Sequence, residues 1–308
     1  MDQQPPKEDK MFKPIRDIMA IRKKPILLMN ISHVIPTSVM LLQKELRGKN
    51  VPELDVVLNT PGGHIESAYK IVKLLRIHAK KVNVIVPFYS KSAGTLICLS
   101  ANTFILSVGS ELGPLDVQIN EHQEGDIDTY KSALNGYKSL EQIQSHALEN
   151  LDIATRLILS RTGNRMRLQE VIKLAIEFSS NTSGCLYDQV HPKTITEYAR
   201  SLDVGEQYGT RILTRYMGWD KEKAKNVVRR LVYDYPSHGF IIDKEELSEL
   251  GFTTEDMPVE LEEISEAITL LLSTGDHSED QQVKLFIPET PKATEAPQAN
   301  EKRNKKAK

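Results

Sequence analysis

The chain has few cysteines, few aromatic residues and no long uninterrupted apolar run. Two of its 308 residues are cysteine and 6% are aromatic. Two cysteines, Cys98 and Cys185, cannot form a disulfide framework, so we expect reduced structural thiols in a cytoplasmic protein. The N-terminus is polar, which predicts no secretory signal, and polar residues interrupt the longest apolar candidate, 264–272. No membrane span is therefore expected.

An excess of one charge sign is also missing. The sequence has 40 Lys and Arg against 42 Asp and Glu, a formal net charge of −2 at pH 7. This balance gives no reason to expect a nucleic acid or an anionic lipid surface as partner. The histidines lack metal-ligand spacing and no glycine-rich phosphate loop occurs, so we expect no metal and no cofactor.

What the chain does contain is a repeated strand–helix pattern between residues 56 and 118. Three short runs rich in valine and isoleucine, at 56–58, 82–86 and 104–108, are typical of buried parallel strands. Segments with helical periodicity separate them, and a further strand is expected at 25–30. The pattern predicts an α/β fold in which helices cover a parallel sheet.

The rest of the chain divides by composition. We expect an N-terminal arm at 1–24 with a short helix, one domain at 25–272 and a disordered tail at 273–308. Within the domain, 25–120 forms the core and 121–272 a helical extension. The extension is expected to contain a loop at 181–191, two helices at 193–202 and 205–216, and a late strand within 235–243. Val283 to Pro288 is an apolar island in the tail and a candidate docking motif for a partner.

Two strand-to-helix junctions carry unusual chemistry. Pro61-Gly62-Gly63 begins one helix, and Ser92-Ala93-Gly94 begins the next. A serine held at the start of a buried helix has a rigid mount for a nucleophile, and glycines let backbone N–H groups approach a substrate closely. The structural alternative is that Ser92 only caps its helix and the glycines only form a turn.

Three motifs together resemble the Clp-protease/crotonase-like superfamily of serine peptidases. They are N-T-P-G-G at 59–63, S-A-G-T at 92–95 and S-x-L-G-P-L-D-x-Q at 110–118. The chain most resembles the serine dehydrogenase proteinase family, relatives of signal peptide peptidase A. V-H-P at 190–192 and Y-P-S-H-G-F at 235–240 are also similar to that family, so the resemblance covers most of the chain.

The resemblance implies a ββα superhelix core with a helical C-terminal extension. It also implies Ser92 as nucleophile, Gly62, Gly63 and Ala93 as oxyanion donors, and an extended peptide substrate or unfolded segment bound beside a strand. Members of this superfamily commonly form homo-oligomers, so the resemblance implies a homo-oligomer. We also expect that an ATPase or other partner binds through residues 283–288.

The general base remains open. The Clp peptidase has a histidine shortly after its serine, but here that neighbourhood reads Leu115-Asp116-Val117. Signal peptide peptidase A uses a lysine further downstream. Lys138 falls in that window and is our predicted base, with Lys131 just before it. Such a lysine needs burial or a neighbouring cation to lower its pKa.

His191 and His238 are alternative bases, and each is also suited to fixing its own loop by hydrogen bonding. Asp116 either satisfies backbone groups of its turn or orients a base. Two other functions compete with a serine peptidase: a crotonase-like acyl-thioester enzyme, such as a hydratase, and a catalytically inactive scaffold. The serine of S-A-G-T favours the peptidase, because hydratases use the oxyanion hole without a nucleophile there.

Overall fold

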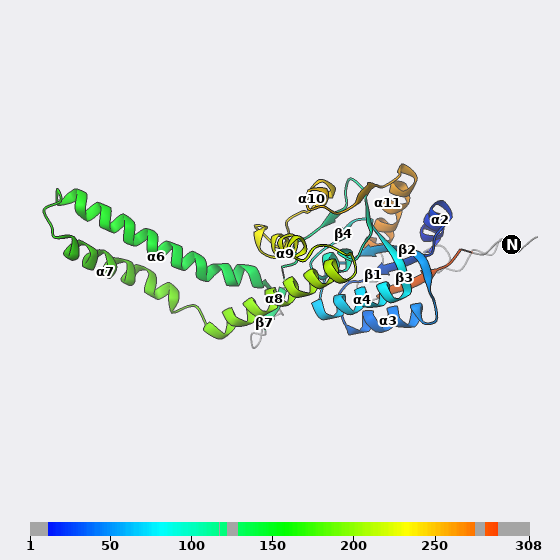
Figure 1. Ribbon diagram of the computed structural model, residues 1–308, viewed down its shortest axis with the longest axis horizontal. Helices are drawn as coiled ribbons and strands as arrows, with labels where there is room; N and C mark the ends of the chain where they lie inside the picture. The colour runs from blue at the N-terminus through cyan, green and yellow to red at the C-terminus, as the bar shows by residue number, and fades with distance from the viewer. Residues whose placement is uncertain (1–11, 117, 122–128, 275–280, 289–308) are drawn as a thin grey trace, which may run out of the picture.

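The computed structural model describes residues 12–116, 118–121, 129–274 and 281–288. Its centre is a six-stranded sheet in the order β10-β1-β2-β3-β5-β9 (Figure 1). Only β10 runs antiparallel to its neighbour. The strands are β1 (Ile26–Asn30), β2 (Val51–Asn59), β3 (Ala79–Val86), β5 (Thr103–Leu106), β9 (Thr254–Asp256) and β10 (Gln282–Phe286). The predicted α/β fold with a covered parallel sheet is confirmed.

Helices cover both faces of the sheet because its strands are apolar on both sides. Within β1, Ile26 and Leu28 join one buried cluster and Leu27 and Met29 join the other, as the alternation of side chains along a strand requires. Each such fully buried side chain contributes about 1.5–3 kcal/mol relative to exposure. Figure 1 shows helices against both faces of the sheet. These are α2 (Lys13–Arg22) with α11 (Val259–Thr274), and α3 (Pro36–Leu46) with α4 (Ile65–His78).

The N-terminal segment is part of this fold. The expected helix is present as α2, but the prediction of a separate arm is wrong for residues 12–24. Ile15 and Ile18 are buried in the second cluster, and the Arg22 Nε donates a hydrogen bond of 2.6 Å to Asp55 Oδ2 in β2. The Asp55 side chain has 0% exposure, so its charge requires this partner.

The tail also differs from its prediction. The apolar island lies in β10, which pairs with β1 along its whole length, with Leu285 opposite Leu27. Leu285 and Val283 pack against the core, so the island closes an otherwise open sheet edge and is not a free docking motif. Residues 275–280 and 289–308 lie outside the described part of the chain.

The extension is helical as predicted, with longer helices than expected. α7 extends to Tyr187 and so covers 181–187 of the predicted loop at 181–191, because its small and hydroxyl residues face α6 and hydroxyls among them bond carbonyl groups. Ser179 Oγ donates to Ala147 O of α6 at 2.7 Å, and Thr182 Oγ1 to Phe178 O at 2.9 Å. The helices are α6 (Ala133–Arg161), α7 (Leu168–Tyr187), α8 (Pro192–Arg215), α9 (Lys221–Arg229), a π-helical turn (Arg230–Asp234) and α10 (Lys244–Glu249).

Two further expectations in the extension are wrong. The helices at 193–202 and 205–216 are one helix, α8, in which Gly209 serves close packing: a Cβ there would lie 2.7 Å from Val228 Cγ1 of α9. The late strand within 235–243 is absent from the described residues, where Ile242 makes an isolated bridge to Leu112. The remaining elements are α5 (Ala93–Cys98), β4 (Tyr89–Ser90), β6 (Glu111–Leu112), β7 (Gln118–Glu121) and β8 (Thr129–Ser132).

Candidate active site

The two motif-bearing junctions lie side by side at the carboxyl edge of the sheet. Thr60, which follows β2, forms a parallel bridge with Ser90, which follows β3. The Thr60 N–H donates to Tyr89 O at 3.1 Å and the Lys91 N–H to Thr60 O at 3.0 Å. The carboxyl edge of a parallel sheet is where such folds bind ligands, because the strand ends and helix starts meet there.

Gly62 lies directly against Ser92. A Cβ on Gly62 would stand 2.9 Å from Ser92 Cβ and 2.9 Å from Lys91 O, and its φ of +117° is a conformation that side chains rarely adopt. Gly63 is as confined, with a would-be Cβ 2.6 Å from Val34 N and O. The two glycines therefore let the turn pack against the serine on one side and the Val34 backbone on the other.

Ser92 has a strained backbone, and its hydroxyl does not cap the helix that it precedes. Its φ of 50° and ψ of −115° fall outside the regions that L residues favour. The Oγ makes no hydrogen bond to the start of α5 and instead donates to Asp116 O at 3.4 Å, a long bond. The interpretation of Ser92 as an ordinary N-cap therefore lacks its defining contact.

The backbone donors near Ser92 differ in availability. The Gly62 N–H already donates to Thr60 Oγ1 at 3.2 Å. For the N–H groups of Gly63 and Ala93, no acceptor occurs among the described residues. Of the three predicted oxyanion donors, Gly63 and Ala93 are the ones with a free hydrogen.

Asp116 connects Ser92 with one of the candidate bases. Its carboxylate is 1% exposed, and His238 Nδ1 lies 3.5 Å from Asp116 Oδ2. Ser132 Oγ donates to the same oxygen at 2.5 Å, and the Leu134 N–H donates to Oδ1 at 3.2 Å. His238 Nδ1 is buried without a hydrogen bond in the described structure, and its 3.5 Å separation from Asp116 Oδ2 is within ion-pair distance. Asp116 thus meets Ser92 through its carbonyl and His238 through its carboxylate.

The predicted lysine base has a different partner. Lys138 lies on α6, and its Nζ donates to Tyr233 O at 2.6 Å. No hydrogen bond between Lys138 and Ser92 occurs among the described residues. Lys131 is in β8, but its side chain lies outside the described part. Lys91 Nζ pairs with Glu111 Oε1 at 2.9 Å, and His191 is an exposed residue at the start of α8 without a capping bond.

Sequence reasoning missed two polar residues that hold the surroundings of Ser92 together, the buried Thr95 and the half-buried Ser132. Thr95 Oγ1 lies 2.9 Å from Ser90 O and 2.8 Å from Gly113 O, and it also accepts from the Gly113 N–H at 3.3 Å. It therefore ties α5 to the L-G-P-L turn. Ser132, the other missed residue, caps α6 by accepting from the Asn135 N–H at 3.0 Å. A serine just before a helical pattern is a usable sequence signal for that role.

Cys98 is not a competing nucleophile. Its thiol is buried in α5 and lies 3.4 Å from Ser90 Oγ. Burial raises the pKa of this thiol to about 12, so the reactive thiolate is scarce at neutral pH. Ser92 is thus the half-buried residue at the start of a helix whose thiol is unreactive.

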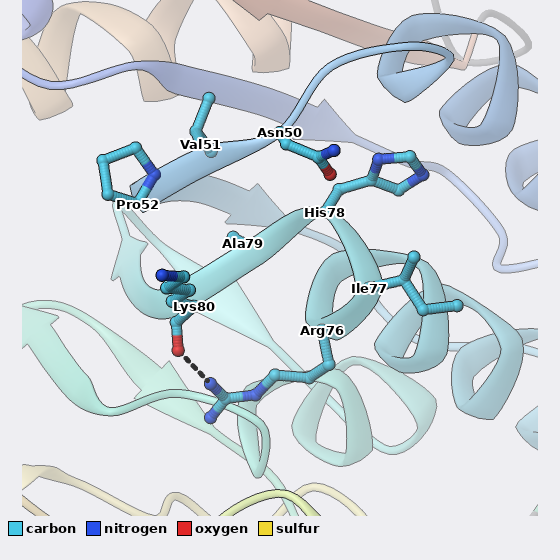
Figure 2. A pocket seen from close by; sticks show the side chains of 8 residues that line it. All are labelled: Asn50, Val51, Pro52, Arg76, Ile77, His78, Ala79 and Lys80. Atoms are coloured by element: carbon cyan, nitrogen blue, oxygen red, sulfur yellow. Dashed lines mark hydrogen bonds between the residues drawn. The ribbon is translucent and has the colours of Figure 1, made fainter.

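A surface hollow of about 490 Å³ lies at the other edge of the sheet (Figure 2). Residues at the starts of β2 and β3 line it, together with the last turn of α4. Figure 2 shows Arg76 turned away from His78, with a 3.3 Å hydrogen bond from Arg76 Nη1 to Lys80 O. The hollow is remote from the junctions that carry Ser92 and the glycine turn, so we do not assign it to the same site.

Neither a metal cluster nor a membrane-spanning helix is found in the described ranges. No group of three His, Cys, Asp or Glu residues there has the geometry to hold an ion. No helix in that part of the chain combines the length and apolar character that a membrane span requires.

The fold and the site together give a covered parallel sheet whose carboxyl edge carries a glycine turn against a strained serine. A sequence model described as "ClpP-like SDH-type serine proteinase" matches residues 37–167. Over these residues the chain is similar to the ClpP-like SDH-type serine proteinase family, in agreement with the resemblance inferred from the motifs.

Two proteins of Methanocaldococcus jannaschii, both described as uncharacterized, are similar in sequence. One is 41% identical over 69 residues, which is 22% of this chain and 24% of the relative. The other is 31% identical over 106 residues, 34% of each protein. The chain thus matches a quarter to a third of the length of these curated relatives.

Among solved structures, the 1510-N membrane-bound stomatin-specific protease is similar with a TM-score of 0.41 and 13% identity, over 76% of this chain and 78% of that one. ClpP1 from Listeria monocytogenes is similar with a TM-score of 0.37 and 12% identity, over 80% and 98% of the two chains. In both comparisons the helices and strands of the two chains correspond only loosely.

Proposed function

We propose that this protein is a serine peptidase that cleaves peptide bonds through an acyl-enzyme on Ser92. The observation that carries the proposal is the state of Ser92: strained backbone, a hydroxyl not used for capping, and a shared contact with the residue that faces His238. Backbone strain of this kind costs about 1–3 kcal/mol and persists where the surrounding structure enforces it, commonly at active sites.

We infer that His238 is the general base and Asp116 its positioning residue. With Nδ1 toward Asp116, the other ring nitrogen, Nε2, is left to accept the Ser92 proton. Ser92 Oγ then bonds to the substrate carbonyl carbon, and the N–H groups of Ala93 and Gly63 stabilise the negative oxygen. The C–N bond breaks, His238 returns the proton to the leaving amine, and a water molecule hydrolyses the ester by the same route.

Lys138 remains the competing base. Its ammonium is bonded to Tyr233 O, and a lysine base must release its proton to act. The two assignments predict different effects of substitution, because only removal of the true base should abolish activation of Ser92.

We further propose a peptide or unfolded protein segment as substrate, bound as an extended strand, and a homo-oligomeric protein of the signal peptide peptidase A type located in the cytoplasm. No ATPase partner is proposed through residues 283–288, since these belong to β10 and the segment after it. As a domain organisation we propose one unit that runs from α2 to β10, with 121–272 as its helical extension.

The experiment is labelling of the purified chain with a fluorophosphonate probe, followed by mass mapping of the adduct. We expect an adduct on Ser92 that is absent from Ser92→Ala. We expect His238→Gln to lower the labelling rate by about 10²-fold or more, the range of general acid–base catalysis, and Lys138→Met to leave it within a few fold.

The reverse pattern, loss in Lys138→Met with labelling retained in His238→Gln, would assign the base to Lys138. Peptidase assays on casein-derived peptides then separate hydrolysis from mere reactivity. A folded protein with no adduct at any pH would refute the peptidase and favour the acyl-thioester enzyme or the inactive scaffold.

A further inference from the structure

The candidate base, His238, lies in the segment 235–243 between the π-helical turn and α10. We call this segment the base loop. Apart from an isolated bridge at Ile242, it contains no helix or strand in this described part of the chain. Because the loop has no regular ladder of backbone hydrogen bonds, the position of His238 depends on the contacts that hold the two ends of the loop.

Both ends of the base loop bind to one residue, Glu246, in the first turn of α10. At the start of the loop, the Tyr235 hydroxyl donates a hydrogen bond of 2.6 Å to Glu246 Oε1. At its end, Asp243 Oδ1 accepts a hydrogen bond of 2.9 Å from the Glu246 N–H and so caps α10. The side chain and the backbone of Glu246 therefore hold opposite ends of the loop that carries His238.

The same carboxylate oxygen also holds the π-helical turn that precedes the base loop. Arg230 is the first residue of this turn, and its Nη2 lies 2.6 Å from Glu246 Oε1. Tyr235 directly follows the last residue of the turn, so Glu246 binds on both sides of it. Hydrogen bonds to an ionised acceptor are shorter and stronger than neutral ones, and this oxygen accepts two of them.

The π-helical turn in addition contacts the segment that contains Asp116. Leu231 O accepts a hydrogen bond of 2.8 Å from the N–H of Leu115, the residue before Asp116. Glu246 thus fixes a turn that is itself bonded to the neighbour of Asp116. These contacts place Asp116 and the base loop in one hydrogen-bonded frame, in which His238 Nδ1 lies 3.5 Å from Asp116 Oδ2.

Tyr235 is suited to anchor the loop because it is buried and its hydroxyl stays protonated. Its side chain packs against Phe240, with the ring centroids 5.0 Å apart, and this contact joins residues on either side of His238. Burial raises the pKa of Tyr235, and the hydrogen bond to Glu246 raises it further. The hydroxyl therefore remains a donor to Glu246 at neutral pH.

We propose that Glu246 is a positioning residue for His238. By holding Tyr235 and Arg230 on one oxygen, it fixes the base loop so that His238 faces Asp116 and its other ring nitrogen is directed to Ser92. The inference rests on the proposed function, in which His238 is the base. Loss of the Glu246 carboxylate would leave the start of the loop unanchored, and a displacement of a reacting group by about 1 Å can lower a rate on the order of 100-fold.

The first experiment measures the rate of fluorophosphonate labelling of Ser92 in three variants, with circular dichroism melting to confirm that each one folds. Glu246→Leu removes both side-chain contacts and is expected to label about 10–100-fold more slowly. Glu246→Gln keeps an oxygen acceptor in the same place and is expected to stay within a few fold of the wild type. Glu245→Leu is the matched control and should label at the wild-type rate, because Glu245 is an exposed acid in the same first turn.

The second experiment determines whether the effect passes through His238. In the His238→Gln background, Glu246→Leu is expected to change the remaining labelling rate by no more than about two-fold, since no base is left to position. In the otherwise wild-type protein, Tyr235→Phe should slow labelling by about 3–10-fold, the effect of one lost hydrogen bond. In peptidase assays, Glu246→Leu should lower kcat and leave KM unchanged, since Glu246 does not contact the substrate.

The outcomes separate this inference from the proposed function. If wild-type Ser92 takes no label, or if His238→Gln labels at the wild-type rate, the proposed function fails and the inference fails with it. If His238→Gln is slow but Glu246→Leu matches Glu245→Leu, the inference alone is overturned. An equal effect of Glu246→Leu with and without His238 would also overturn it. If Glu246→Leu does not fold, Tyr235→Phe decides, and a wild-type rate in that variant would refute the role of Glu246.

Discussion

Gly62→Ala is the substitution that most directly tests the contact between the glycine turn and the nucleophile. The added methyl would lie 2.9 Å from both Ser92 Cβ and Lys91 O, closer than real Cβ contacts, and alanine would have to adopt a φ of +117°. The backbone conformation costs about 1–3 kcal/mol and forced overpacking about 1–3 kcal/mol more. We therefore expect Gly62→Ala to lower the free energy of unfolding by about 2–6 kcal/mol, or to displace Ser92 and so relieve the steric conflict.

Gly48→Ala is the matched control. Gly48 also has a positive φ, +71°, but no atom lies within 4 Å of its would-be Cβ. Only the conformational cost of about 1–2 kcal/mol applies there. Comparing the two variants therefore removes the conformational cost that they share, and leaves the contact with Ser92 together with the difference between the two backbone conformations.

The assays are urea unfolding and the rate of fluorophosphonate labelling at Ser92. We expect Gly62→Ala to lose more stability than Gly48→Ala, or to keep its fold while the labelling rate falls about 100-fold, the effect of a misplacement near 1 Å. Gly48→Ala should label at the wild-type rate. If the two variants match in both stability and labelling, the packing of Gly62 on Ser92 is not as described and the reasoning fails.

Two other predictions concern strain and pH. Ser92→Gly should be at least as stable as Ser92→Ala by urea unfolding, since glycine adopts a φ of 50° without strain; a clearly more stable alanine variant would contradict a strained Ser92. Glu53 accepts hydrogen bonds from Lys24 and Asn83. These bonds lower the pKa of Glu53 below 4.5, and the bond from Lys24 has the larger effect. Its stabilising effect should be complete above pH 4.5 and disappear as the pH falls through the lowered pKa. The difference in unfolding free energy between wild type and Glu53→Gln should shrink over that window, and a constant difference would argue against the pairing.

Local patterns in the sequence determined the strands and the two junctions. Valine- and isoleucine-rich runs produced β2, β3 and β5 where expected, because buried parallel strands need continuous apolar side chains. The P-G-G and S-A-G motifs marked the starts of their helices, because the backbone conformation of glycine and the close approach that it permits depend on a few consecutive residues. The resemblance to the family rests on these features as well.

Only the tertiary structure decided the contacts between distant segments. The approach of His238 to Asp116 depends on how the loop after the π-helical turn folds back on the sheet edge, which no local pattern encodes. Likewise, the residues of β10 were expected to belong to a disordered tail. Their short apolar run is ordered by pairing with β1, which is far away in the sequence, and no local pattern shows that pairing. α7 runs through a polar stretch because α6 buries its small residues. In each case the deciding free energy comes from packing between elements, and packing overrides local preference.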